Sequence, residues 1–200
     1  MGQRFWYTHL RVLGRGWQPV WARSKDPALS DLAAAGIEVW GLFSELIGLP
    51  SNEMIAITHG PTDASPPRFS ALEAEILEQR EMGPTARPVE PFARLERPGL
   101  YVLRSFHLPG PEHVDEIVQL STGAWTTFET DDAWESEPVG LFVSSPVGRT
   151  VDRMLLVTWY DGFGSWERSR QPDPEARDRF VRRHMLTNGT NAVATSLVDV

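Results

Sequence analysis

Hydrophobic and aromatic positions along this chain alternate between strand-like runs and stretches with helical spacing. Residues 5–13 form an aromatic and apolar run that ends at Gly14, which is typical of a strand. The stretch that follows, as far as Gly36, carries apolar residues at the spacing of one helix face: Trp17, Val20 and Trp21. The chain therefore opens with a predicted strand and helix.

The rest of the first half predicts two strands, a second helix and a closing strand. The strands cover residues 37–43 and 54–58, and the turn between them is rich in Gly, Pro, Ser and Asn. Apolar residues in residues 69–77 outline an amphipathic helix, and residues 89–95 predict the closing strand. The helix rests on four positions: Phe69, Leu72, Ile76 and Leu77.

The second half repeats this order of elements. Its predicted strands cover residues 101–108, 139–144, 154–159 and 192–198, and its helices centre on residues 114–125 and 176–181. Each half is thus a βαββαβ, or ferredoxin-like, unit, whose sheet keeps one bare face for a second sheet to cover. We predict an α+β fold of two tandem ferredoxin-like units, residues 1–97 and 98–200, whose sheets pack into an α+β barrel.

Short sequence matches support the duplication. "GLFSELIGLPSNEMIAITHG" in the first half corresponds to "GLFVSSPVGRTVDRMLLVTWYDG" in the second, and both begin with Gly-Leu-Phe. The opening strands are aligned through a shared Leu-Arg pair, which matches Leu10 and Arg11 with Leu103 and Arg104.

These motifs resemble a known family. "YVLRSFHLPG" is similar to the opening strand of the NIPSNAP family, within the dimeric α+β barrel superfamily, and "GLFVSSPVGRTVDRMLLVTWYDGFGSWERSR" resembles its later signature. The resemblance implies two sheets packed into a barrel, with a ligand site in or beside the enclosed cavity. The first half departs from the pattern, because His59 stands where the second has Trp159 and the Tyr160-Asp161 pair is missing.

Composition narrows the classes of function. With 19 Lys and Arg against 27 Asp and Glu the net charge is −8, which argues against nucleic-acid and membrane-surface partners. The absence of cysteine excludes disulfides, thiolate metal sites and a cysteine nucleophile. No apolar run resembles a signal or a membrane span, so we expect a cytoplasmic protein. A small-molecule ligand is the expected partner, and the duplicated chain fits a monomer or a homodimer.

Alternation along the first strand suggests a candidate site. Tyr7, His9 and Arg11 share one face, and the opposite face, which suits packing against helices, carries Trp6, Thr8, Leu10 and Val12. The repeat alignment places Arg104 with the first set, next to Phe106. Imidazole transfers protons near neutral pH and guanidinium holds developing negative charge. We predict His9, Arg11 and Arg104 as catalytic residues, and Tyr7 and Phe106 as substrate-binding residues.

A structural role for the same residues is the alternative. Arg11 and Arg104 could pair with barrel acids such as Glu38 or Glu45, with His9 as a hydrogen-bonded interior histidine. His59 and Trp159 end equivalent strands, where the mouth of a barrel would lie. We predict that these two contact the ligand, against the alternative of a simple surface position.

The five histidines show no H-x-H or H-E-x-x-H spacing, so no metal site is predicted. We also expect no cofactor, although a haem axial histidine needs no fixed spacing and stays open. The predicted function is a cofactor-independent lyase, isomerase or oxygenase acting on a small apolar or aromatic substrate, anionic or neutral, held in the barrel cavity. The alternative is a non-catalytic small-ligand-binding or scaffold protein of the NIPSNAP-like type.

Overall fold

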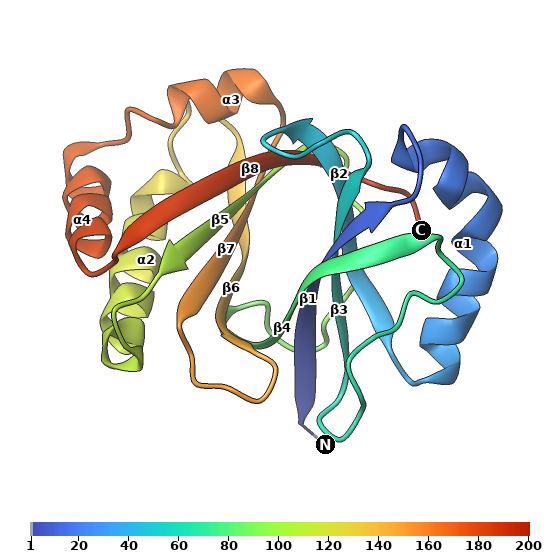
Figure 1. Ribbon diagram of the computed structural model, residues 1–200. Coiled ribbons are helices and arrows are strands. Elements are labelled where there is room, and N and C mark those ends of the chain that lie inside the picture. Colours follow the sequence, from blue (N-terminus) through green and yellow to red (C-terminus); the bar gives the residue numbers. More distant parts are fainter. Residues whose placement is uncertain (1) are drawn as a thin grey trace.

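The computed structural model describes residues 2–200 and shows a closed barrel of antiparallel strands with helices on two opposite sides (Figure 1). Closure leaves no strand edge free to pair with another chain. The strands are β1 (Gln3–Val12), β2 (Glu38–Ile47), β3 (Glu53–Pro61), β4 (Ala74–Arg87), β5 (Leu100–His107), β6 (Ser136–Pro146), β7 (Arg153–Tyr160) and β8 (Gly189–Leu197).

The strand order around the barrel is β1-β3-β2-β8-β5-β7-β6-β4. Each half of the chain contributes four neighbouring strands in the same relative order, β4-β1-β3-β2 and β8-β5-β7-β6. The two halves join where β2 pairs with β8 and where β4 pairs with β6. This arrangement confirms the predicted α+β barrel of two ferredoxin-like units.

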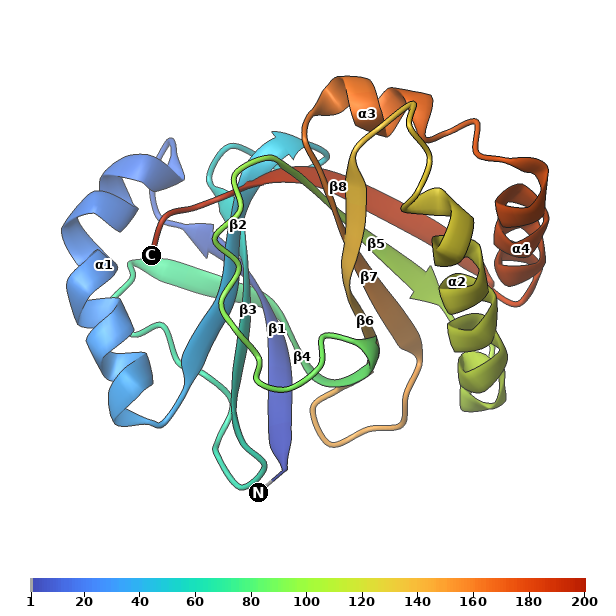
Figure 2. The ribbon, with the colours of Figure 1, turned by 180° about the vertical axis from the view of Figure 1, so that it is seen from behind.

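Helices cover the outer face of each half. In the first half α1 (Trp17–Ala34) packs on the sheet, where it meets Trp6, Leu10 and Val12 of β1. The second half is covered by α2 (Val114–Phe128), α3 (Phe163–Arg168) and α4 (Pro174–Met185), and the 3-10 turn η1 (Pro111–His113) precedes α2 (Figure 2). The start of α4 is capped by Asp173, whose carboxylate accepts the N–H groups of Glu175 and Ala176.

Two predicted elements of the first half are wrong. Residues 69–77 form no helix: residues 62–73 are irregular and β4 begins at Ala74. Phe69 and Leu72 produced the helical spacing because they pack against the α1 side of the sheet from an irregular segment. Residues 89–95 form no strand, because the long β4 already occupies the closing position between β1 and β6. The first unit therefore lacks its second helix.

The inside of the barrel is filled with aromatic side chains. The buried cluster there includes Phe5, Trp40, Phe43, Tyr101, Phe142 and Trp159. The repeated Gly-Leu-Phe motif belongs to this packing: a Cβ at Gly41 would lie 2.6 Å from the ring of Phe43, and one at Gly140 would lie 2.5 Å from that of Phe142. Both strands also shift register at this glycine. The motif is explained by close packing.

Residues 88–99, the connecting segment between β4 and β5, cross one end of the barrel. Phe92 and Leu95 of this segment pack against the aromatic interior, and the Leu95 N–H donates to the Trp40 carbonyl at 2.8 Å. The Phe92 ring meets that of Phe5 edge to face, with centroids 5.0 Å apart. This end of the barrel is therefore covered by the chain itself.

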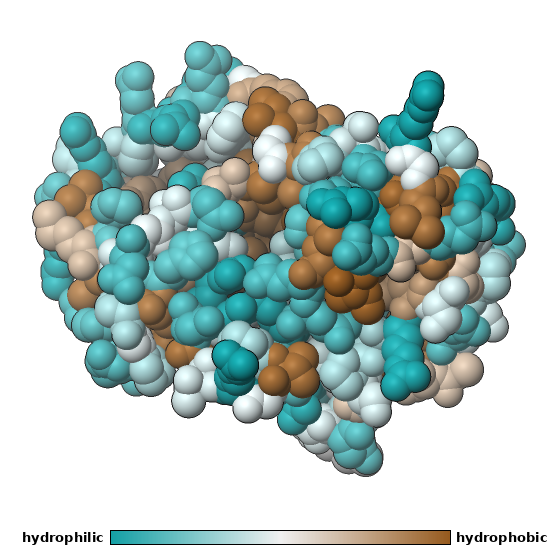
Figure 3. Space-filling model, viewed as in Figure 1, coloured by the Kyte–Doolittle hydropathy of each residue, from teal (hydrophilic) through white to brown (hydrophobic). Residues whose placement is uncertain are grey.

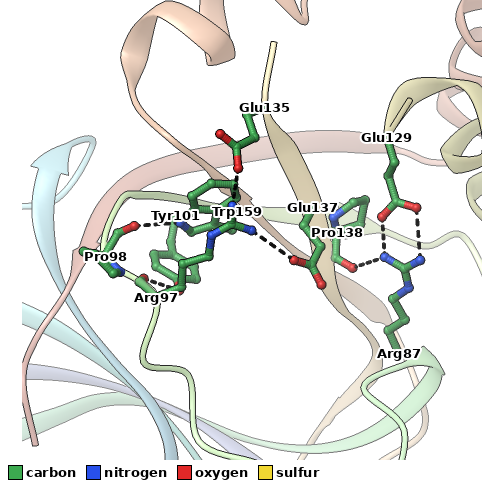
Figure 4. Close-up of polar contacts among 9 residues, drawn as sticks. All are labelled: Arg87, Arg97, Pro98, Tyr101, Glu129, Glu135, Glu137, Pro138 and Trp159. Atoms are coloured by element: carbon green, nitrogen blue, oxygen red, sulfur yellow. Dashed lines mark hydrogen bonds and ion pairs between the residues drawn. The ribbon is translucent and has the colours of Figure 1, made fainter. Parts of the chain in front are cut away.

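Polar contacts tie the connecting segment to the second half (Figure 4). The Arg97 guanidinium lies 3.3 Å from the centroid of the Trp159 ring and contacts Glu135 and Glu137. Just before the segment, Arg87 binds the Glu129 carboxylate that follows α2. These contacts fix the path of residues 88–99 across the barrel.

Candidate functional site

The predicted site residues lie at three separate places in the structure. One end of the barrel holds Tyr7, His9 and Arg11, and the covered end holds His59 and Trp159. Arg104 and Phe106 lie on the outer face of the second half, beneath its helices. The prediction that Tyr7, His9, Arg11 and Arg104 share one cavity is therefore wrong.

At the first place, β1 alternates as predicted, but the partner of its basic residues is different. His9 Nε2 lies 2.7 Å from Glu53 Oε2, and Arg11 donates to Glu53 Oε1 through Nη2 at 2.9 Å and Nε at 3.1 Å. Glu53 is buried, so its charge needs these donors. The predicted partners Glu38 and Glu45 are wrong for Arg11. A hydrogen-bonded interior histidine fits this geometry, while the catalytic role of His9 and Arg11 stays a prediction.

More ion pairs continue this network toward the second half. Glu78 accepts from Arg153 at 3.2 Å and from Arg80 at 3.4 Å, and Arg80 also binds Asp152. Burial, reinforced by the Glu78 charge, raises the pKa of Tyr7 above its ordinary value, so its hydroxyl stays protonated. The charges at this end compensate one another.

His59 and Trp159 lie beneath the connecting segment. His59 Nδ1 is 2.6 Å from Gln3 Oε1, and its ring packs against that of Phe92. Burial lowers the pKa of His59, against the nearby Glu38 charge. Trp159 Nε1–H donates to the Pro98 carbonyl at 2.9 Å. Contact of these two residues with a ligand stays a prediction, at a mouth that the chain covers.

Arg104 points outward, whereas the sequence analysis grouped it with Tyr7, His9 and Arg11. The prediction was wrong because the sequence alignment of the two opening strands was shifted. The pairing register makes Phe5 the counterpart of Tyr101, since each lies opposite the corresponding residue of the third strand in its unit. Thr8 is then the counterpart of Arg104, and the Leu-Arg match is displaced by an odd number of residues. Such a displacement moves every side chain to the opposite face of the sheet.

A cavity of about 250 Å³ lies between this outer face of the second half and its helices, and we call it the outer cavity. Strands β5, β6, β7 and β8 form its floor and α2, α3 and α4 supply its walls. In the space-filling view the surface is hollowed between α3 and α4, with apolar side chains inside (Figure 3). Its aromatic lining consists of Phe106, Trp125, Phe128, Tyr160, Trp166 and Phe180.

The charged residues of the outer cavity are all basic. Arg104, Arg170, Arg183 and His184 line it, and its lining contains no Asp or Glu. Arg183 is only 7% exposed; its Nη1 donates to Ser121 Oγ at 3.0 Å, and its guanidinium lies 4.6 Å from the centroid of the Phe106 ring. Within residues 2–200, neither Arg104 nor Arg183 forms an ion pair with a carboxylate.

Burial changes the proton affinity of these groups. It lowers the pKa of Arg104 and of Arg183, and the Arg104 charge lowers that of Arg183 further. Both guanidinium groups still carry their charge at neutral pH, because arginine does not lose its proton in proteins. Burial raises the pKa of Tyr160, although a hydrogen bond with the Ser169 side chain and, after it, the neighbouring arginines oppose this shift. The Tyr160 side chain is therefore a neutral hydroxyl donor.

Sequence reasoning missed Tyr160 and Arg183 as site residues, whereas Trp166 is among the tryptophans that it left free to line an aromatic pocket. One signal could have found Arg183: it follows Phe180 by three residues and Ala176 by seven, which places it on the apolar face of α4. A charge on the buried face of an amphipathic helix needs either a partner in the protein or a ligand.

Candidate metal ligands do not cluster in the described part of the chain. Within residues 2–200, no three His, Asp or Glu side chains come together as a metal site. His184, exposed at the rim, is the only histidine in the lining of the outer cavity. In the same part of the chain, no helix is both long and apolar enough to span a bilayer.

No protein-family model and no curated protein matches this sequence. Solved structures do match the fold. An anthrone oxidase-like protein aligns over 98% of this chain and 92% of its own, with a TM-score of 0.57 and 12% identity. The chain has a duplicated ferredoxin-like barrel fold. This fold also appears in a candidate monooxygenase of Lactobacillus acidophilus, at TM-score 0.57, 8% identity and coverage of 98% and 94%.

A mutant chlorite dismutase from Candidatus Nitrospira defluvii aligns at TM-score 0.55 and 10% identity, covering 98% of this chain and 92% of its own. Identities this low show a common fold alone. The shared fold is an α+β barrel with a duplicated unit, and these matches do not specifically support the NIPSNAP family.

Proposed function

We propose that this protein binds a small aromatic molecule in the outer cavity and acts on it as an enzyme that needs no tightly bound cofactor. The observation that carries the proposal is a hollow walled by six aromatic side chains, one of which is Tyr160. Aromatic walls with a few polar groups are typical of small-molecule sites. The predicted barrel interior is a weaker candidate, because aromatic side chains fill it.

Tyr160 is the candidate catalytic group of the outer cavity. Its raised pKa keeps the hydroxyl protonated, so it donates a hydrogen bond to a substrate oxygen. As negative charge develops on that oxygen during the reaction, the hydrogen bond strengthens, and transition-state stabilisation follows. His9, predicted from the sequence to move the proton, is instead held by Glu53 at the end of the barrel.

Among the predicted reaction types we favour the oxygenase. One structural relative is described as anthrone oxidase-like and another as a candidate monooxygenase. Anthrone is an aromatic ketone that ionises through its enol, and its oxidation consumes one O2 and releases anthraquinone and one water. A neutral tyrosine hydroxyl beside arginines is suited to hold the enolate oxygen in such a reaction.

A binding protein without catalysis, of the NIPSNAP-like type suggested by the sequence motifs, is the second candidate. The observation in its favour is that the only histidine lining the outer cavity, His184, lies at its exposed rim. Under this alternative, ligand binding persists while turnover is absent.

Binding is tested with two matched variants on β8. Neighbouring residues of a strand point to opposite faces, and Thr190 lines the outer cavity while the exposed Asn191 does not. We expect cinnamamide to bind the wild type and the Asn191→Phe variant, and to bind Thr190→Phe at least about 10-fold more weakly, since the new ring fills the cavity. Equal binding by both variants would overturn the proposed site.

Catalysis is tested separately with anthrone and an oxygen electrode. We expect protein-dependent oxygen uptake, with kcat reduced roughly 100-fold in Tyr160→Phe and KM little changed. If cinnamamide binds but no aromatic ketone or phenol is consumed faster with protein than without it, the binding-only function replaces the enzyme.

A further inference from the structure

The outer cavity concentrates positive charge in an acidic protein. The chain has 27 Asp and Glu residues against 19 Lys and Arg, yet the outer cavity is lined by three arginines and one histidine and by no acidic residue. Residues drawn at random from this sequence would include more acidic than basic side chains. The imbalance therefore requires a local physical reason.

Arg183 is buried without the compensation that another buried arginine receives. Arg80 is 4% exposed and binds the carboxylates of Glu78 and Asp152. Arg183 is 7% exposed, and its only hydrogen bond within residues 2–200 goes to a neutral group, the Ser121 hydroxyl. Burying a charge is costly unless an opposite charge accompanies it. This fold pairs Arg80 but leaves Arg183 unpaired.

Both arginines keep hydrogen-bond donors free beside the cavity. A guanidinium group has five N–H donors. Arg183 uses Nη1 for Ser121 and rests between the rings of Phe106 and Phe180, at 4.6 and 4.8 Å from their centroids. In the described chain, Arg104 makes no side-chain hydrogen bond. Every side-chain nitrogen of Arg104 and Arg183 that lacks a hydrogen-bond partner keeps some exposed surface. Their unused donors therefore border open space.

We propose that the molecule held in the outer cavity is an aromatic carboxylate, whose negative charge lies between Arg104 and Arg183. This inference rests on the proposed function, because it names the substrate class of that same cavity. Guanidinium binds a carboxylate through two parallel hydrogen bonds, and an anion there compensates two charges that the protein leaves unpaired. The ring of the ligand packs among the aromatic walls of the cavity.

Calorimetric titration with cinnamate and its neutral amide, cinnamamide, tests this inference. The two probes share one shape and differ in charge. We expect the wild type to bind cinnamate at least about 10-fold more tightly than cinnamamide, since a charged hydrogen bond is lost with the amide. Arg183→Met and Arg104→Met should each weaken cinnamate binding about 10- to 100-fold and leave cinnamamide binding unchanged.

The control is Arg177→Met, which removes an exposed arginine from the same helix, α4. It should bind both probes as the wild type does. Equal affinity of the wild type for cinnamate and cinnamamide would overturn the carboxylate inference and leave the aromatic site standing. Failure of both probes to bind would overturn the site as well. If Arg177→Met loses as much cinnamate binding as the other two variants, net charge explains the effect. That result would refute the assigned role of Arg104 and Arg183.

Discussion

Replacing Arg183 by methionine should make the ligand-free protein at least as stable as the wild type. Methionine keeps an unbranched apolar side chain against Phe106 and Phe180 and removes the charge. Ser121 is left without its guanidinium donor, but its hydroxyl can donate to a carbonyl of the preceding helical turn. The substitution thus removes a buried charge without leaving a buried polar group unpaired.

The magnitude follows from opposing terms. The variant loses a charged hydrogen bond, about 1.5–3 kcal/mol, and cation–π contacts of about 0.5–2 kcal/mol. The variant no longer bears the cost of desolvating the guanidinium charge, which is several kcal/mol. Replacing buried ionic groups by apolar ones is known to stabilise proteins by about 1–4 kcal/mol. We expect a net gain of about 1 kcal/mol. The same change at Arg80 leaves Glu78 and Asp152 short of a partner and should cost about 3 kcal/mol.

Urea unfolding, followed by tryptophan fluorescence without ligand, measures both variants. With a slope of about 2 kcal/mol per molar urea, the midpoints of Arg183→Met and Arg80→Met should differ by about 2 M. Similar destabilisation of the two variants would refute the reasoning, because it would mean that Arg183 is compensated within the protein as Arg80 is. An anion site would then be unnecessary.

Two further changes test the fold. Gly140→Ala should lower the free energy of unfolding by about 1–3 kcal/mol, because its Cβ meets the Phe142 ring at 2.5 Å. The control Gly162→Ala, with open space around the new Cβ, should change this free energy by less than about 0.5 kcal/mol. Urea midpoints give both values, and equal midpoints would contradict the packing role of the Gly-Leu-Phe motif. Burial lowers the pKa of His59 below its ordinary 6.5, so the unfolded chain takes up the proton more readily and stability falls as the pH drops below about 6.5. The Tm of His59→Gln should therefore fall less than that of the wild type between about pH 7 and about pH 5, and parallel curves would show that His59 does not contribute.

The duplicated barrel was predictable because its signals are local and repeated. Glycine-bounded apolar runs marked strands β1, β5 and β7, and the Gly-Leu-Phe motif reports a packing constraint that recurs in each half. The missing helix of the first half was not predictable in this way. Phe69 and Leu72 have helical spacing, yet an irregular segment delivers the same side chains to the α1 cluster, and pairing of β4 with β1 and β6 decides the conformation.

The site was less predictable because it depends on strand faces and on pairing between distant residues. Alternation correctly grouped Tyr7, His9 and Arg11, but an odd displacement in the repeat alignment put Arg104 on the wrong face. The acid that binds His9 and Arg11, Glu53, comes from the neighbouring strand, and only the antiparallel register brings it there. Charge compensation across elements cannot be deduced from spacing within one element.

The most direct test of the account is a crystal structure of the protein grown with cinnamate. The account predicts the ligand in the outer cavity, its carboxylate within hydrogen-bond distance of Arg104 and Arg183 and its ring against Phe106 and Phe180. A cavity that stays empty at saturating cinnamate, or a carboxylate of the protein itself bound to Arg183, would contradict the claim that these arginines await an anionic ligand.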